Sequence, residues 1–103
     1  MKILGTHNYY VYILTNYNKT VLYVGITNDL KMRMYHHKNP TTEDKLHFTT
    51  KYKCFNLVYY EHFQDVEQAI AREKQIKGYS RMKKENLIKS INSNWDFWND
   101  KIE

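Results

Sequence analysis

Two short runs of β-branched and aromatic residues, separated by a few turn-forming residues, constrain the fold of this chain more than any other feature. Residues 9–14 read Tyr-Tyr-Val-Tyr-Ile-Leu and residues 21–26 read Val-Leu-Tyr-Val-Gly-Ile, a composition typical of β-strands. The intervening residues 16–19, Asn-Tyr-Asn-Lys, favour a turn. Parallel strands need a much longer connection, so the two runs predict an antiparallel hairpin. Gly25 lies inside the second run, and a glycine in a strand usually marks a bulge or the close approach of backbone or ligand.

The rest of the chain predicts one more strand and three helices. Side chains that can cap a helix stand before each expected helix, at Thr27-Asn28-Asp29, at Asp65 and at Ser80. We expect a helix over 30–38, a loop over 39–53 with room for one helical turn, a strand over 55–63, and helices over 66–78 and 81–92. This order predicts an α+β fold in which a three-stranded antiparallel sheet is flanked by helices. The 103 residues contain no linker or repeat, so we expect a single domain over 1–103 with its core at about 9–98.

The composition excludes several classes of protein. Cys54 is the only cysteine, so an internal disulfide and a cysteine-rich zinc site are both excluded. The chain has no run of about 18 apolar residues that would span a membrane. Residues 1–7 lack the long apolar segment of a secretory signal. We therefore expect a soluble protein of a reducing compartment, the cytoplasm, with no membrane partner.

The positive charge is concentrated in one segment. Residues 69–91 carry seven basic and two acidic side chains, which equals the net charge of +5 of the whole chain. A concentrated basic segment indicates a polyanionic partner, most often nucleic acid, whereas the simpler alternative is a solvated helix surface. The basic residues of this segment are Arg72, Lys74, Lys77, Arg81, Lys83, Lys84 and Lys89.

Glu73 is the unusual residue of the expected middle helix. At 100° per residue, the apolar positions of this helix form one stripe, and Glu73 falls near its centre. A carboxylate there is costly unless a partner pairs with it. In the structural interpretation, Glu73 forms an ion pair, or the apolar stripe reaches solvent at the edge of the sheet. In the functional interpretation, Glu73 is a metal ligand or an acid-base group. The stripe comprises Val66, Ala69, Ile70 and Ile76.

The first helix and the hairpin carry further polar groups that permit two interpretations. Arg33 and His37 are neighbours at i and i+4, on the flanks of a face marked by Leu30 and Met34. They are either solvated surface residues or groups that lean into a cleft, where arginine holds phosphate and histidine relays a proton. The tyrosines of the hairpin are either packing residues or hydroxyl donors that reach an active-site water.

Several motifs, taken in order, resemble the GIY-YIG nuclease superfamily, and in particular its small free-standing bacterial members. The first two are Tyr10-Val11-Tyr12 and Tyr23-Val24-Gly25, and they are followed by Arg33 and Glu73. The tracts around residues 24–37, 57–61 and 69–77, and the close at 94–95, are similar as well. The resemblance covers about residues 9–98 and implies a metal-dependent endonuclease that hydrolyses DNA phosphodiester bonds, in DNA repair, recombination or nucleic-acid processing.

The resemblance also implies a role for each of five residues. Glu73 matches the metal-binding glutamate, which would hold Mg²⁺ or Mn²⁺ together with waters and phosphate oxygens. Tyr12 matches the general base or its relay, and Tyr23 the tyrosine that places the attacking water. Arg33 matches the arginine that grips the scissile phosphate. His37 stands where some relatives carry a residue that supports proton transfer, and we expect all five side chains to line one cleft.

Two departures from the family pattern and two rival functions remain. Tyr10 replaces the first glycine of the first motif, and valine replaces the central isoleucine of both motifs. Asn86 is a candidate for a structural asparagine of the last helix.

The alternative function is a non-catalytic nucleic-acid-binding module on the same fold. The other rival is a protein-interaction domain whose aromatic C-terminal region docks a partner. We expect DNA to be bound mainly through its phosphates by the basic helices of residues 69–91.

Overall fold

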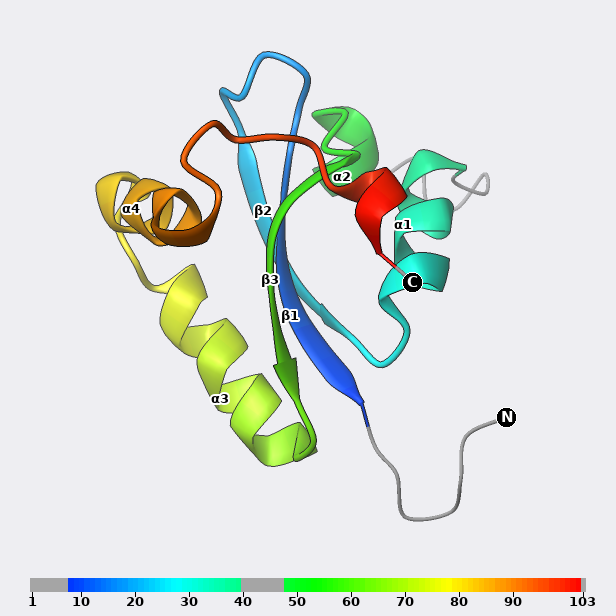
Figure 1. The fold of residues 1–103 in the computed structure, drawn as a ribbon, viewed down its shortest axis with the longest axis vertical. Coiled ribbons are helices and arrows are strands. Elements are labelled where there is room, and N and C mark those ends of the chain that lie inside the picture. The colour runs from blue at the N-terminus through cyan, green and yellow to red at the C-terminus, as the bar shows by residue number, and fades with distance from the viewer. Residues whose placement is uncertain (1–7, 40–47, 103) are drawn as a thin grey trace.

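A computed structural model describes residues 8–39 and 48–102 and contains one three-stranded sheet with helices on both faces (Figure 1). The fold prediction is confirmed: the sheet is antiparallel, with strand order β2-β1-β3, so β1 is central. Part of the expected loop, residues 40–47, lies outside the described residues, as do residues 1–7. The elements are β1 (Tyr9–Thr15), β2 (Leu22–Thr27), α1 (Leu30–Lys38), α2 (Phe48–Lys51), β3 (Asn56–Phe63), α3 (Val66–Lys77), α4 (Arg81–Ile91) and a 3-10 turn, η2 (Asn99–Lys101).

The β1–β2 hairpin forms where the two β-prone runs predict it. Its register places Tyr12 opposite Gly25 and Leu14 opposite Tyr23. The Asn16 side chain closes the turn, since its Oδ1 accepts hydrogen bonds from the backbone N–H groups of Thr20 and Val21. This is the local bonding that makes asparagine favourable in turns.

The helices begin at the capping residues that the sequence predicts. The side chains of Asp29, Asp65 and Ser80 accept hydrogen bonds from backbone N–H groups in the first turns of α1, α3 and α4. Each cap satisfies an N–H group that has no partner within its helix, which is why these residue types are favoured there. Gly78 follows the last residue of α3, as expected, with a right-handed φ of −79°.

The two faces of the sheet bury different apolar clusters. On one face, Val11, Ile13 and Val58 pack against side chains of α3 and α4. On the other face, Tyr12, Leu14 and Leu57 pack against side chains of α1 and against Cys54. Figure 1 shows α3 and α4 on one side of the sheet, and α1, α2 and η2 on the other. The alternation of buried residues along β1 therefore decides which helices each side chain meets.

The apolar stripe predicted for α3 is partly wrong. Ala69 and Ile76 are fully buried, but Val66 and Ile70 are 39% and 40% exposed. The buried face follows positions 69, 73 and 76, so Glu73 lies within the packed face itself. The two other apolar residues project beyond the sheet that the helix covers.

The C-terminal segment covers the outer edge of β3. The N–H of Trp98 donates to the carbonyl of Leu57 at 2.7 Å, and the side chain of Asn99 accepts from the N–H of Leu57 at 2.9 Å. The Asn99 amide also donates to the carbonyl of Phe55 at 2.8 Å. A strand edge that β1 leaves unpaired thus receives hydrogen bonds from residues 98–99.

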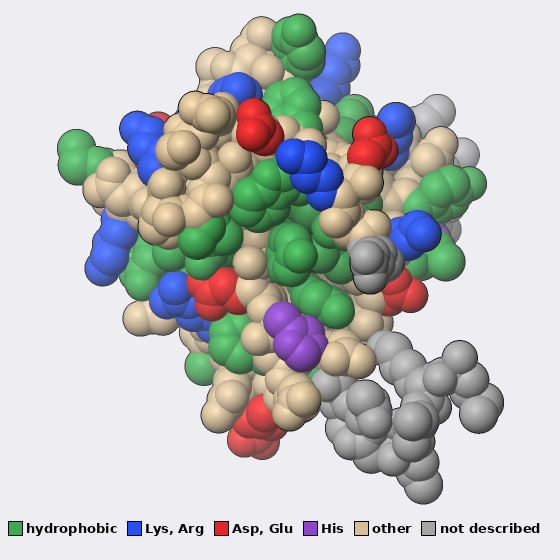
Figure 2. All heavy atoms as spheres, viewed as in Figure 1, with side chains coloured by type: hydrophobic (Ala, Val, Ile, Leu, Met, Phe, Trp, Pro, Cys, Tyr) green, Lys and Arg blue, Asp and Glu red, His purple; other side chains and the backbone are tan. Residues whose placement is uncertain are grey.

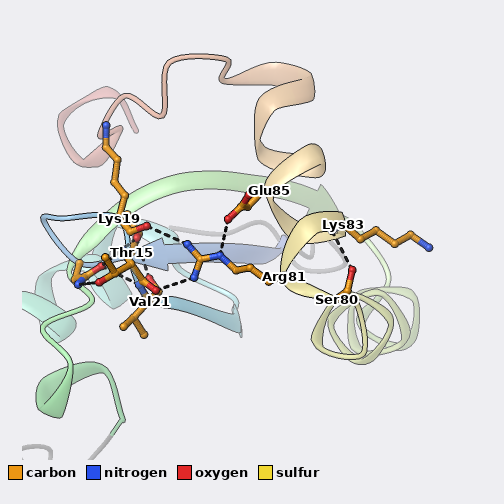
Figure 3. A network of polar contacts seen from close by, with 9 residues as sticks. Thr15, Lys19, Val21, Ser80, Arg81, Lys83 and Glu85 are labelled. Carbon is orange, nitrogen blue, oxygen red and sulfur yellow. Dashed lines mark hydrogen bonds and ion pairs between the residues drawn. The ribbon is translucent and has the colours of Figure 1, made fainter.

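Arg81 ties the tip of the hairpin to α4 (Figure 3). Its guanidinium donates to the carbonyl oxygens of Thr20 and Lys19 at 2.8 and 3.0 Å, and to Glu85 one turn further along α4 at 2.7 Å. Arg81 and Glu85 face one another beside the hairpin turn. The hairpin is therefore held from a helix about sixty residues away in the chain.

Within residues 8–39 and 48–102, no helix has the length and apolar character needed to cross a membrane.

Candidate functional site

Tyr12 occupies the centre of the sheet with its side chain over Gly25 of the neighbouring strand. The tyrosine is fully buried, and its partner in the β1–β2 register is Gly25. A Cβ atom built on Gly25 would lie 2.5 Å from both Cζ and Oη of Tyr12, and 2.9 Å from Cε2 of Tyr23. No real Cβ makes such contacts, so the glycine is required for the close approach of the phenol to the β2 backbone.

The Tyr12 hydroxyl meets His37, which lies one turn after Arg33 on α1. Tyr12 Oη and His37 Nε2 are 3.0 Å apart, within hydrogen-bonding distance. The other ring nitrogen, Nδ1, lies 3.1 Å from Oγ1 of Thr49 on α2. The sequence predicts a role for Tyr12 and His37, but Thr49 was missed, because no spacing relates a loop threonine to a helix residue twelve positions earlier.

Tyr23 completes a group of three rings. Its ring centroid lies 6.3 Å from that of Tyr12 and 5.7 Å from that of His37, while Tyr12 and His37 are 5.8 Å apart. The two tyrosines come from adjacent strands and the histidine from the helix packed above them. The structure therefore brings these three predicted site residues together.

Burial and neighbouring charges both act on the Tyr12 hydroxyl. Burial raises its pKa well above the ordinary value of a tyrosine, and Tyr23 and Glu73 raise it further. The positive charge of Arg33, which is itself exposed on α1, opposes this rise and lowers the pKa. Tyr12 therefore keeps its proton unless a neighbouring base accepts it.

Glu73 approaches this group from the opposite side of the sheet. Its helix, α3, packs across the sheet and contacts β2, the edge strand that carries Gly25 and Tyr23. The Glu73 side chain is 14% exposed, and its Oε2 lies 3.3 Å from Nζ of Lys77, a half-exposed residue one turn later. The ion pair predicted as the structural interpretation is thus present, but its cation is a flexible surface lysine.

The donor set suits a divalent cation of one particular kind. Among the described residues, no three His, Cys, Asp or Glu side chains lie close enough to one another to hold a metal ion as a group. Glu73 offers a single carboxylate, and Mg²⁺ is commonly held by one or two carboxylates with waters and phosphate oxygens completing the shell. The largely buried Glu73 carboxylate fits that requirement.

The departure at Tyr10 leaves the three-ring group unobstructed. Its ring packs against the residues of β3, with centroids 6.0 Å from Tyr60 and 5.1 Å from His62. Tyr10 therefore extends the packing between β1 and β3, at a distance from the β2 side of the sheet where Tyr12 meets Tyr23.

A second polar group lies on the α3 side of the sheet. Arg72 donates three hydrogen bonds of 2.9–3.1 Å to the two carboxylate oxygens of Glu61, and a further one to the hydroxyl of Tyr79 at 3.2 Å. The hydroxyl of Tyr59 donates to the same carboxylate. Burial would raise the pKa of Glu61, but the bonds from Arg72 and Tyr59 outweigh it and hold the pKa below its usual value.

Two asparagines, one in α4 and one just after it, differ in burial. Asn86 is exposed on α4, whereas Asn92, just after the helix, is buried. The Asn92 amide donates to the carbonyls of Val58 and Asp96, and its Oδ1 accepts from the N–H of Asp96. Asn92 thus joins α4 to β3, and the sequence around it gave no signal of this contact, because its partners are backbone groups.

Two comparisons with known proteins agree with this geometry. A family model described as the GIY-YIG catalytic domain matches residues 8–86. The solution NMR structure of the UPF0213 protein BH0048 from Bacillus halodurans is similar, with a TM-score of 0.55 and 31% sequence identity over 85% of this chain and 89% of that one. No curated protein gives a significant match to the chain.

Proposed function

The chain belongs to the GIY-YIG family of catalytic domains, and from this premise we propose that it is a metal-dependent endonuclease that hydrolyses DNA phosphodiester bonds. The observation that carries the proposal is the hydrogen bond between Tyr12 Oη and His37 Nε2, with the exposed Arg33 beside it. The Tyr12–His37 pair provides a proton acceptor, and Arg33 provides an anion-binding group at the same place. Hydrolysis of a phosphodiester uses both.

In the proposed reaction, Tyr12 takes a proton from the attacking water. As the water oxygen bonds to phosphorus, its proton moves to Tyr12 Oη while the phenolic proton moves to His37 Nε2. This coupled transfer avoids a free tyrosinate, which burial of Tyr12 disfavours. The water then need not be deprotonated in advance.

The remaining residues orient the reactants. Tyr23, from the edge strand, positions the water beside Tyr12. The Arg33 guanidinium binds the non-bridging oxygens of the scissile phosphate, where its planar donors match the geometry of the anion. A divalent cation held by Glu73 would stabilise the negative charge on the leaving oxygen.

Lysines of α3 and α4 are the proposed contacts to the DNA backbone. Arg72 and Arg81 lie in the same basic segment, but their guanidinium groups are engaged with Glu61 and with the hairpin turn. On the face seen in Figure 2, the described basic side chains are interspersed with acidic ones around an apolar area, so that face offers DNA no continuous positive surface. The lysines of this segment are Lys74, Lys77, Lys83, Lys84 and Lys89, of which Lys77 is paired with Glu73 and Lys83 lies over the ring of Tyr79.

The test is cleavage of labelled duplex, nicked, branched and single-stranded DNA with Mg²⁺, with Mn²⁺ and with chelator. We expect cleavage that requires the metal and that Glu73→Gln lowers at least about 10³-fold, because a bound cation supplies several kcal/mol of charge stabilisation. The matched control is Glu67→Gln, which removes an exposed carboxylate in the first turn of the same helix and should cleave like the wild type.

Binding without cleavage by the wild type under every condition would instead support the non-catalytic nucleic-acid-binding module. A salt titration separates either case from a protein-docking domain, because phosphate contacts make affinity fall steeply with salt. Cleavage by Glu73→Gln equal to that of the wild type would refute the assignment of the metal to Glu73.

A further inference from the structure

We propose that Thr49 is a positioning residue that keeps the proton of neutral His37 on Nδ1, so that Nε2 is free to accept the proton of Tyr12. The inference rests on the proposed nuclease function, and it assigns a part in that reaction to a residue outside every motif of the chain. It also gives α2, a helix of four residues, a defined task beside the site.

The hydrogen bonds form an unbroken chain across three elements. Tyr12 Oη on β1 lies 3.0 Å from His37 Nε2, and His37 Nδ1 lies 3.1 Å from Thr49 Oγ1. The Thr49 residue is 5% exposed, so bulk water competes little for its contact with His37. Both nitrogens of the imidazole therefore have a partner supplied by the protein.

The chain permits two proton arrangements, and only one of them serves the reaction. Neutral imidazole carries one N–H, and both partners of His37 are hydroxyls, which can donate as well as accept, so the distances alone admit either arrangement. If Nε2 carried the proton, it would donate to Tyr12, and the histidine could not remove the phenolic proton. If Nδ1 carries it, the N–H donates to Thr49 Oγ1, and Nε2 presents a lone pair to Tyr12.

The hydroxyl oxygen of Thr49 serves both before and after the transfer. Once Nε2 has taken the proton, His37 is an imidazolium whose two nitrogens are both donors. The Nδ1–H then keeps the same acceptor, so the transfer requires no rearrangement of α2. A preorganised acceptor of this kind favours the charged state without a cost at the moment of reaction.

The backbone around Thr49 fixes the position of its side chain. The Thr49 carbonyl accepts a 2.8 Å hydrogen bond from the N–H of Cys54, which is fully buried just before β3. Between them, Lys53 takes a left-handed φ of 55°, which turns the chain from α2 back to the strand. The anchoring of α2 to the sheet through Cys54 explains how a helix of one turn can hold a histidine ring in register.

The experiment measures the tautomer and the kinetics of the same variants. The ¹⁵N chemical shifts of neutral His37, assigned by comparison with His37→Gln, report which nitrogen carries the proton. Thr49→Val keeps the shape of the side chain but removes its oxygen, Thr49→Ser restores an oxygen, and Thr50→Val alters the next threonine of the same helix as a control.

We expect the proton on Nδ1 in the wild type, in Thr49→Ser and in Thr50→Val, and a shift toward Nε2 in Thr49→Val. For DNA cleavage, Thr49→Val should lower kcat about 10- to 100-fold with KM unchanged, as loss of a residue that orients a histidine commonly does. Thr49→Ser should recover most of the loss. If Thr49 had only a structural role, Thr49→Val would lower the thermal stability but leave the tautomer of His37 unchanged.

Two results would overturn the inference: a proton on Nε2 of His37 in the wild type, or a folded Thr49→Val that keeps the wild-type tautomer and kcat. Should Thr49→Val fail to fold, the wild-type and Thr49→Ser spectra still decide the tautomer. Absence of cleavage by the wild type, together with the expected tautomers, would refute the nuclease assignment while supporting the role of Thr49 in orienting His37.

Discussion

Two polar groups of the molecule contain the same three kinds of side chain in opposite states. On the α3 side, Arg72 clamps Glu61 through both carboxylate oxygens while Tyr59 donates to the same carboxylate. In the candidate site, the corresponding types are Tyr12, Arg33 and Glu73. There the tyrosine meets a histidine, the arginine is exposed, and the glutamate is paired with a half-exposed lysine.

The contrast concerns how a structural polar group differs from the group that we propose to be reactive. Burial raises the pKa of both tyrosines, so a perturbed pKa does not by itself distinguish them. What differs is the use of the arginine. Arg72 has its donors taken up by protein acceptors, whereas Arg33 lies exposed beside the Tyr12–His37 pair, where a phosphate can reach it.

The largest difference is expected between Tyr12→Phe and Tyr59→Phe. Removal of the Tyr12 hydroxyl should lower kcat for DNA cleavage about 10²- to 10⁴-fold, the usual contribution of general acid-base catalysis. Tyr59→Phe should keep kcat within about twofold and lose about 1 kcal/mol of unfolding free energy, the net value of one hydrogen bond. Cleavage rates and urea unfolding of both variants test this difference. Equal losses of kcat would contradict the proposal that Tyr12 is reactive and Tyr59 structural.

Gly25→Ala sharpens the comparison, because the Tyr12 group depends on the absence of a side chain at Gly25, whereas the Arg72–Glu61 group depends on no glycine of the described residues. The new Cβ would stand 2.5 Å from Tyr12 Oη, so the phenol must move away from His37. We expect a loss of about 1–3 kcal/mol in stability, typical of overpacking, together with lower kcat.

Gly78→Ala provides the control for that change. Its Cβ would lie 3.5 Å from the carbonyl oxygen of Gln75 in an ordinary right-handed conformation. This variant should unfold at an equal or slightly higher denaturant concentration. A Gly25→Ala protein as stable and active as the wild type would show that Tyr12 does not need its present position.

For Glu61→Gln we expect an effect on stability alone, without an effect on cleavage. The pKa of Glu61 is lowered in the folded protein, so the carboxylate contributes stability above its ordinary value of 4.5 and loses it as pH falls through the folded value. We expect Glu61→Gln to be about 1–2 kcal/mol less stable than the wild type at pH 7, with normal cleavage.

Urea unfolding at several pH values checks this prediction. The difference between Glu61→Gln and the wild type should narrow as pH falls below 4.5, because the unfolded wild-type chain takes up the proton before the folded protein, in which the pKa of Glu61 is lower. A difference that stays constant with pH would mean that the charge of Glu61 does not contribute to the pairing.

The sequence predicts the parts of this molecule that depend on local chemistry. The strands follow from β-branched and aromatic runs, and the helix starts follow from Asp29, Asp65 and Ser80, since a cap acts within its own helix. Glu73 could be identified as unusual from its position on a helical face. The roles of Tyr12, Tyr23, Arg33, His37 and Glu73 come from the resemblance and stay predictions.

The features that the sequence did not predict depend on contacts between distant segments. The hydrogen bond from His37 to Thr49 crosses from α1 to α2. Arg72 and Arg81 appear in the sequence as two charges of a basic segment, yet both are used inside the protein. The exposure of Val66 and Ile70 depends on where α3 meets the edge of the sheet, which helical periodicity does not contain.

The C-terminal cover of β3 also bears on whether another chain can add a strand at that edge. An open strand edge offers unpaired N–H and C=O groups on which another chain can add a strand, the first step of many aggregates. Trp98 and Asn99 occupy such groups at Phe55 and Leu57 with one backbone donor and one amide side chain. A side chain cannot propagate a ladder, so residues 98–99 end the sheet where a neighbouring molecule would otherwise extend it.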